Sequence, residues 1–98
     1  MKTGIEIIAD ERQRQKEVEG FTASHDAEHS AGELAMAAMC YAMEPCWRPA
    51  EMAPLGWPWC SCDPKDGFRP SPDNRIKELA KAGALIAAEI DRLQNLKQ

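Results

Sequence analysis

Long apolar runs are missing from this 98-residue sequence, and so is any excess of basic residues. No apolar stretch approaches the roughly 18 residues that a membrane-spanning helix needs, so we expect no membrane partner. The chain carries 12 Lys and Arg against 16 Asp and Glu, which gives a net charge of -4. Direct nucleic-acid binding rests on clustered cations that displace counterions from phosphates. The charge balance therefore argues against a nucleic-acid partner.

Familiar catalytic patterns are also missing. The sequence has no glycine-rich phosphate loop, no serine-histidine-aspartate pattern and no paired helical carboxylates with phosphatase spacing. This favours stoichiometric binding over turnover, and we assign no catalytic residue and no cofactor. Residues 1–10 carry acids among the apolar positions and no small-residue cleavage site, so they do not resemble a signal peptide. We expect a cytoplasmic protein.

Length and composition indicate a single globular domain, residues 1–98. With 44% hydrophobic and 29% charged residues, the chain has ordinary globular usage. Its four cysteines are Cys40, Cys46, Cys60 and Cys62. Without a secretory signal, free thiols are favoured over a disulfide framework.

The first predicted helix covers residues 4–18. Thr3 and Glu6 have the spacing of a capping box, in which hydroxyl and carboxylate each bond a free backbone amide. The residues predicted to share the apolar side are Ile5, Ile8, Ala9 and Val18. Those predicted to be solvated are Glu11, Arg12, Arg14, Lys16 and Glu17.

The second predicted helix covers residues 30–43. Ser30 and Glu33 repeat the capping-box spacing, and Pro45 stops the helix. Residues 34–43 are apolar all round, which is typical of a helix in the middle of a bundle or at a subunit contact.

The third predicted helix covers residues 72–95, with Ser71 as its cap and Pro72 at the first helical position. A heptad-like seam follows, with a glycine where a neighbouring element can come close: Ile76, Leu79, Gly83, Ile86, Ile90 and Leu93. Because a short chain has a small core, this seam and the apolar second helix predict a homo-oligomer, most simply a dimer.

Residues 44–71 contain all three tryptophans and six of the seven prolines. Proline prevents regular helix or central strand, while burial of the indole rings favours order. The predicted fold class is all-α, a small irregular three-helix bundle with a long, ordered Pro/Trp-rich crossover loop.

One candidate site begins at His25, Asp26 and His29. In a continuous helix, His25, His29 and Glu33 would share one face, a geometry that suits a divalent metal. A capping box at Ser30 would break this row. Three interpretations stay open: a structural loop, a ligand-binding site and a metal site.

A second candidate site is Trp57-Pro58-Trp59, which could stack a nucleobase while Arg48 or Arg69 binds a phosphate. The alternative is that these rings pin the loop onto the core. We expect His25 to pack with Trp57 and Trp59 in one unit. Zinc binding by Cys46, Cys60 and Cys62 together with His25 or His29 is a further alternative, although one residue between Cys60 and Cys62 is tighter than usual.

Short sequence motifs are spread over most of the chain. They are Glu11-Arg12-Gln13-Arg14-Gln15, Glu19-Gly20-Phe21-Thr22, His25-Asp26, His29, Gly32-Glu33-Leu34-Ala35, Tyr41-Ala42, Trp57-Pro58-Trp59, Lys81-Ala82-Gly83-Ala84-Leu85-Ile86, Ala88-Glu89-Ile90 and Arg92-Leu93. As a set they resemble a family of small, mostly uncharacterised proteins of tailed phages and prophages. The chain departs from that pattern at Phe21, at Ala27 and after Trp59. The resemblance implies a phage origin and an accessory role in the cytoplasm of the infected host.

The expected function is that of a phage-encoded accessory protein, for host takeover or anti-defence, that binds a host protein or a nucleotide-like small molecule. The candidate binding residues are His25, Asp26, His29, Glu33, Trp57, Trp59 and Arg69. The alternative is a metal-dependent, all-α nucleotide pyrophosphohydrolase, which would need Asp26, Glu28 and Glu33 to help hold a metal.

Overall fold

The computed structural model describes residues 1–49, 56–59 and 67–96, with the backbone alone for His25. Its three main helices are α1 (Gly4–Val18), α3 (Glu33–Ala42) and α4 (Arg75–Asn95), accompanied by the short helix α2 (Ala23–Ala27) and the 3-10 turn η1 (Pro45–Trp47). No strand occurs in these described ranges. The predicted all-α, three-helix fold is confirmed. None of the described helices is long and apolar enough to cross a membrane.

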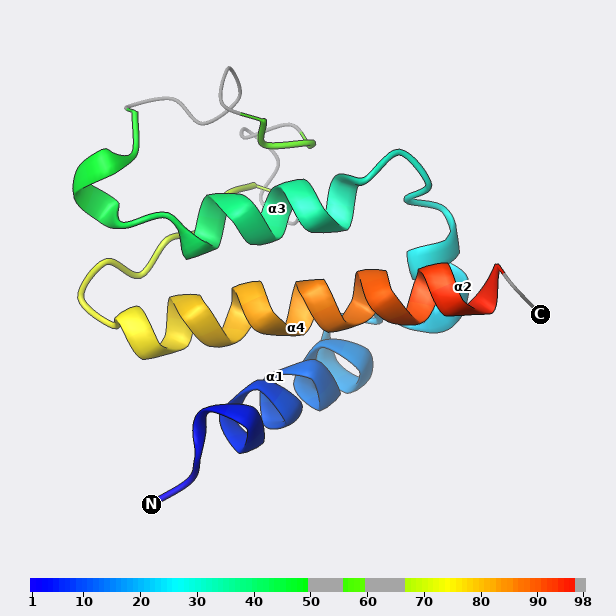
Figure 1. Cartoon of the computed structure of the whole chain (residues 1–98), viewed down its shortest axis with the longest axis horizontal. Coiled ribbons are helices and arrows are strands. Elements are labelled where there is room, and N and C mark those ends of the chain that lie inside the picture. Colours follow the sequence, from blue (N-terminus) through cyan, green and yellow to red (C-terminus); the bar gives the residue numbers. More distant parts are fainter. Residues whose placement is uncertain (50–55, 60–66, 97–98) are drawn as a thin grey trace.

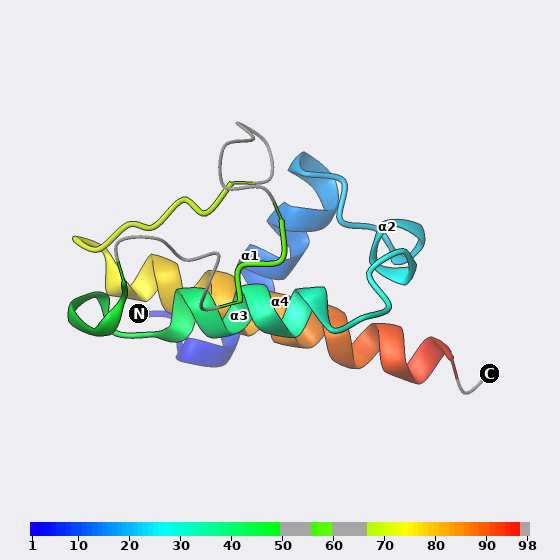
Figure 2. The ribbon, with the colours of Figure 1, turned by 90° about the horizontal axis from the view of Figure 1, so that it is seen from above.

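The central element is α4, against which α1, α2 and α3 all pack. α3 runs beside α4 in the opposite direction, and α1 crosses α4 obliquely on the side away from α3 (Figure 1, Figure 2). The apolar composition of residues 34–43 predicted that this helix lies in the middle of the bundle or at a subunit contact. In the structure Met36 and Met39 remain 37% and 38% exposed, so α3 buries only one face within the single chain.

The core lies where α3 and α4 face each other. Leu34, Ala37, Ala38, Cys40 and Tyr41 of α3 meet Ala82, Leu85 and Ala88 of α4, and Trp57 completes the cluster. Phe21, Trp59 and Phe68 pack against it from outside. Because alanine side chains are small, the two backbones can approach closely and bury the few large side chains between them.

The helix starts agree with the sequence in one case of three. α1 begins after the predicted capping box, in which the Glu6 amide donates to Thr3 and the Thr3 amide donates to Glu6. The predicted box at Ser30 does not form. α3 instead begins at Glu33 after Gly32, whose φ of +86° is left-handed, and the Glu33 carboxylate accepts from the Ala31 amide at 2.7 Å.

The start of α4 also differs from the prediction. The helix begins at Arg75, and its cap is Asn74, whose side chain accepts from the Lys77 amide at 3.1 Å. Ser71 instead accepts from the Asn74 amide in a turn at 2.8 Å. The Ser71 amide donates to the buried Glu78 carboxylate, which holds this segment outside the helix.

The buried side of α1 differs from the prediction. Ile5 and Val18 are 82% and 71% exposed, whereas Arg12 and Gln15 are 9% and 3% exposed. Arg12 is buried because its guanidinium donates to Asp26 of α2 at 3.0 Å and to the Phe21 carbonyl at 3.3 Å. Specific polar partners thus decide which side of α1 faces inward.

The predicted seam of α4 lies on the outside. Ile76, Leu79, Ile86, Ile90 and Leu93 are between 46% and 67% exposed, because α3 packs on the alanine face instead. Gly83 does mark a close approach, since a Cβ there would lie 2.6 Å from Cδ1 of Ile8 in α1.

Candidate functional site

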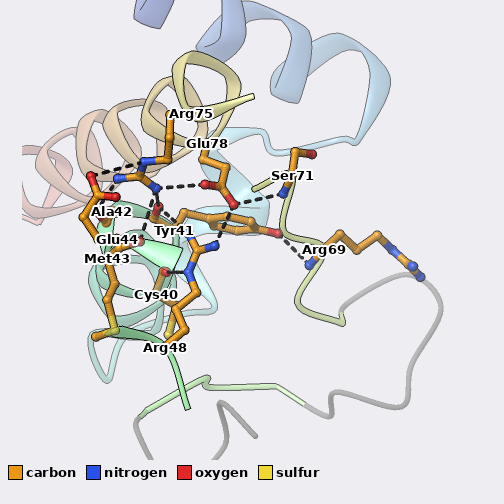
Figure 3. A network of polar contacts seen from close by, with 10 residues as sticks. All are labelled: Cys40, Tyr41, Ala42, Met43, Glu44, Arg48, Arg69, Ser71, Arg75 and Glu78. Carbon is orange, nitrogen blue, oxygen red and sulfur yellow. Dashed lines mark hydrogen bonds and ion pairs between the residues drawn. The ribbon is translucent and has the colours of Figure 1, made fainter. Parts of the chain in front are cut away.

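A buried carboxylate organises the end of the core at which α3 stops. Glu78 of α4 is 0% exposed. Its carboxylate accepts from Arg48 and Arg75, each at 2.8 Å, and from the Ser71 amide at 2.9 Å (Figure 3). Burial alone raises the pKa of Glu78, but these hydrogen bonds outweigh it and lower that pKa below the ordinary value.

The same two arginines cap the C-terminal end of α3. Arg48 donates to the carbonyls of Cys40 and Tyr41, and Arg75 donates to those of Tyr41, Ala42 and Met43 (Figure 3). The last carbonyls of a helix have no partner within the helix. The arginines satisfy them and, through Glu78, join α3, α4 and the segment after η1 into one unit.

Tyr41 extends from this network into a group of aromatic rings. Its hydroxyl accepts from the Arg69 amide at 3.1 Å. Its ring lies 4.9 Å from Phe68 and 5.7 Å from Trp57 between centroids. Trp57 meets Phe68 at 5.1 Å and Trp59 at 5.5 Å, with interplanar angles of 60° and 82°. Such tilted and edge-to-face contacts stabilise aromatic clusters, so Tyr41 places the tryptophans.

A cavity of about 630 Å³ opens beside these rings, and we call it the tryptophan cavity. Its aromatic lining is Phe21, His29, Tyr41, Trp57 and Trp59. Its charged lining is Glu11, Arg14, Glu19, Glu28, Arg69 and Lys81. The volume falls in the usual range for small-molecule sites, about 300–1,000 Å³. An apolar wall with a few charged groups is also typical of such sites.

The charges of the tryptophan cavity are unevenly paired. Arg14 donates to both carboxylate oxygens of Glu11 at 2.7 Å, and it lies 3.4 Å from Glu19. Lys81 forms no ion pair with any described residue, and its ammonium nitrogen lies 5.2 Å from the centre of the Tyr41 ring. The charge of Lys81 is therefore available to an anion entering the cavity.

Burial also lowers the pKa of Lys81, and repulsion from Lys77 and Arg14 acts in the same direction. Glu11 and Glu19 partly oppose this shift in the pKa. A partly desolvated ammonium attracts an anion more strongly than a fully hydrated one. The position therefore suits a phosphate or carboxylate group of a ligand.

Gln15 supplies a neutral polar group to the same cavity. Its side chain is 3% exposed, and its amide nitrogen donates to Glu11 at 3.3 Å. Its amide oxygen is buried and accepts no hydrogen bond from any described residue. A buried acceptor without a donor costs about 1–3 kcal/mol, and a ligand N–H would remove that cost.

Four of the predicted site residues meet here. His29, Trp57, Trp59 and Arg69 line the tryptophan cavity, and the His29 ring packs edge-on against Trp59 at 5.3 Å. Glu33 stands behind His29, with an oxygen 3.3 Å from Nδ1. Glu33 thus orients the histidine without lining the cavity.

Asp26 belongs to a different place. It is 2% exposed, pairs with Arg12 and lines a second cavity of about 570 Å³ with Lys16, Asp91 and Arg92. Its role in the structure is to hold α2 against α1. Asp26 therefore does not share the lining of the tryptophan cavity, and its predicted role in binding stays a prediction.

The histidine row of the metal hypothesis does not form. α2 ends at Ala27 and α3 begins at Glu33, so His25, His29 and Glu33 do not share one helix. The His25 side chain lies outside the described part, and its predicted packing against the tryptophans stays a prediction.

Cys60 and Cys62 lie outside the described residues, as does much of the predicted ordered loop. Cys40 is a buried free thiol, and burial raises its pKa. Cys46 is exposed and free. Among the residues whose positions are described, no three His, Cys, Asp or Glu are grouped to hold a metal ion.

Sequence reasoning missed the helical residues of the cavity, above all Gln15, Tyr41 and Lys81. A weak signal exists, since Glu11 with Gln15 and Lys81 with Leu85 are each four residues apart and share a helix face. Those faces meet only because α1 crosses α4, which spacing within one helix does not reveal.

Comparisons with protein-family models, curated proteins and solved structures found no match for this chain. The cavity itself is therefore the basis for inferring a function.

Proposed function

We propose that this protein binds, stoichiometrically, a small planar ligand that carries an anionic group, of which a nucleotide is the simplest example. The observation that carries the proposal is the tryptophan cavity, where an aromatic wall lies beside a lysine that has no ion pair to any described residue. The proposal includes an accessory role in a phage-infected cell, where such binding would sequester a signal or metabolite. The resemblance of the sequence motifs to phage proteins supports that role.

Each part of the ligand has a matching group in the cavity. Trp59 and His29 offer ring faces and edges to a planar base. Lys81 attracts the anionic group, and Arg69 lies on the same lining. The Gln15 oxygen can accept from an exocyclic amine.

The pyrophosphohydrolase alternative has less support. It requires Asp26, Glu28 and Glu33 to hold a metal ion together. Asp26 is paired with Arg12, and Glu33 accepts from the Ala31 amide and contacts His29. These bonds stabilise the helix junctions, so binding is the function that the geometry favours. Magnesium-dependent pyrophosphate release from deoxynucleotides would reverse this preference.

The test uses the full chain with adenosine and guanosine monophosphates, the matching nucleosides and inorganic phosphate as probes. Calorimetry and thermal melting report binding, and a ligand at 100 times its Kd stabilises the protein by about 2.7 kcal/mol. We expect the nucleotides to bind more tightly than the nucleosides, and phosphate alone to bind weakly. Mass spectrometry of material released on denaturation extends the search to ligands acquired in the cell.

The decisive variants are Lys81→Gln and Trp59→Leu. We expect Lys81→Gln to weaken nucleotide binding by about tenfold, the effect of losing a charge-assisted hydrogen bond of about 1.5 kcal/mol. Lys77→Gln is the matched control, because this lysine is exposed on α4 and outside the cavity. Absence of a shift with every probe, together with no released ligand, contradicts the proposal.

A further inference from the structure

The outward side of α4 carries a continuous apolar stripe. Ile76, Leu79, Ile86, Ile90 and Leu93 are each between 46% and 67% exposed. With Gly83 they repeat at alternating intervals of three and four residues, which keeps them on one side of the helix. We call these six residues the outer seam. It spans about 26 Å of helix at 1.5 Å per residue.

Apart from Gly83, the outer seam lies outside the contacts that hold the single chain together. α3 packs against the other side of α4, where Ala82, Leu85 and Ala88 are buried. α1 meets the seam at Gly83, where Ile8 packs on the glycine, and the five large side chains of the seam remain about half-exposed or more beside this crossing.

No charge interrupts the seam. Its members are aliphatic apart from Gly83; Ala87 and Gln94 flank one edge, and on the other edge Glu89 is paired with Arg92 at 2.6 Å. Two copies of a chain with net charge -4 repel each other at long range. A contact made through an uncharged stripe avoids placing like charges directly against each other.

We propose that the outer seam joins two copies of this chain into a two-fold symmetric dimer. An intact three-four repeat is the pattern with which one helix packs against another of the same spacing, and a two-fold axis places one seam against its own copy. The five large aliphatic side chains of the seam, each exposed by about half to two thirds, leave roughly 450–500 Å². That area, with a polar rim, approaches the roughly 800 Å² per partner of a stable interface.

The test is the mass of the full chain in solution, measured by light scattering and by sedimentation at 1–100 µM. We expect twice the 10.9 kDa of one chain at the upper concentrations. Ile90→Glu should shift the mass to that of one chain, with the helical circular dichroism retained because Ile90 is half-exposed. A monomer at 100 µM, or an undiminished dimer in Ile90→Glu, overturns the proposal.

Two further variants separate the interface from general effects. Lys77→Glu changes the charge more than Ile90→Glu does, but it lies outside the seam and should leave the dimer intact. Ile86→Asn tests the seam without adding charge, and it should raise the dimer dissociation constant at least tenfold. If Lys77→Glu dissociates the dimer as strongly as the seam variants do, charge and not the seam controls assembly, and the proposal fails. Nucleotide binding by the Ile90→Glu variant is measured alongside its mass. Because Ile90 does not line the tryptophan cavity, loss of the dimer should leave nucleotide binding intact, so the two proposals can fail separately.

Discussion

Trp57 belongs to the buried core, although it lies outside the helices. It is 6% exposed and meets Tyr41, Trp59 and Phe68. Trp59 is only partly buried and contacts His29 at the cavity wall. The two tryptophans therefore have different roles, one in packing and one at the surface of the candidate site.

We expect Trp57→Ala to lower the free energy of unfolding by about 3–5 kcal/mol, because it removes a large buried ring. Chemical denaturation followed by circular dichroism measures the loss. Trp47→Ala is the matched control, since Trp47 is 77% exposed and its removal should change stability by less than about 0.5 kcal/mol. Equal losses of unfolding free energy in the two variants would show that the aromatic cluster does not stabilise the fold.

The crossing of α1 over α4 depends on one glycine. A Cβ at Gly83 would lie 2.6, 2.8 and 3.2 Å from three side-chain atoms of Ile8. More than the tip of the isoleucine is involved, so a rotation of its terminal methyl does not relieve the clash. The two helices must separate or Ile8 must leave its rotamer.

We expect Gly83→Ala to destabilise the protein by about 1–3 kcal/mol through this overpacking. In the Ile8→Ala background the same change should become stabilising by up to about 1 kcal/mol, because alanine is the better helix former. A double-mutant cycle followed by urea denaturation gives the coupling energy. Additive effects of the two changes would contradict the packing of Ile8 on Gly83.

The stability of the whole molecule should depend on pH through Glu78. This carboxylate of α4 bonds Arg48, Arg75 and Ser71, and the two arginines bond the last carbonyls of α3. The folded-state pKa of Glu78 lies below the ordinary value for a glutamate, because the hydrogen bonds from Arg48, Arg75 and Ser71 outweigh its burial. A carboxylate with a depressed pKa stabilises the fold fully above its unfolded pKa. That contribution is lost as the pH falls through the folded pKa.

We therefore expect stability to fall progressively below about pH 4.5, the ordinary pKa of the Glu78 side chain. Glu78→Gln should cost about 3 kcal/mol at pH 7, since it removes the buried charge that pairs with Arg48 and Arg75, and it should flatten the pH dependence below pH 5. Denaturation curves between pH 3 and 7 measure both effects. Glu17→Gln, at an exposed position of α1, should retain the acid slope of the wild type.

An unchanged acid slope in Glu78→Gln would assign the pH dependence to other carboxylates. Glu33 is the next candidate, because the amide of Ala31 and the ring of His29 also lower its pKa against the effect of burial.

Local patterns determined the helices of this protein. Thr3 with Glu6, the run from Leu34 to Ala42 and the periodic residues of α4 predicted three helices in the right places, because capping and helical spacing act within a few residues. The three-residue errors at the starts of α3 and α4 arose where a tertiary contact competed. Glu78 holds Ser71 outside α4, and Gly32 turns the chain before Glu33.

Tertiary structure alone decided which faces meet. Arg12 and Gln15 are buried, and Ile5 and Ile90 are exposed, since Asp26 offers Arg12 a partner and the alanines of α4 offer α3 a close approach. The candidate site likewise combines residues that the sequence indicated with residues that only the structure revealed. The sequence pointed to Trp59 and His29 by residue type, whereas Lys81 and Gln15 joined them only when α1 crossed α4, a geometry that no spacing along one helix encodes.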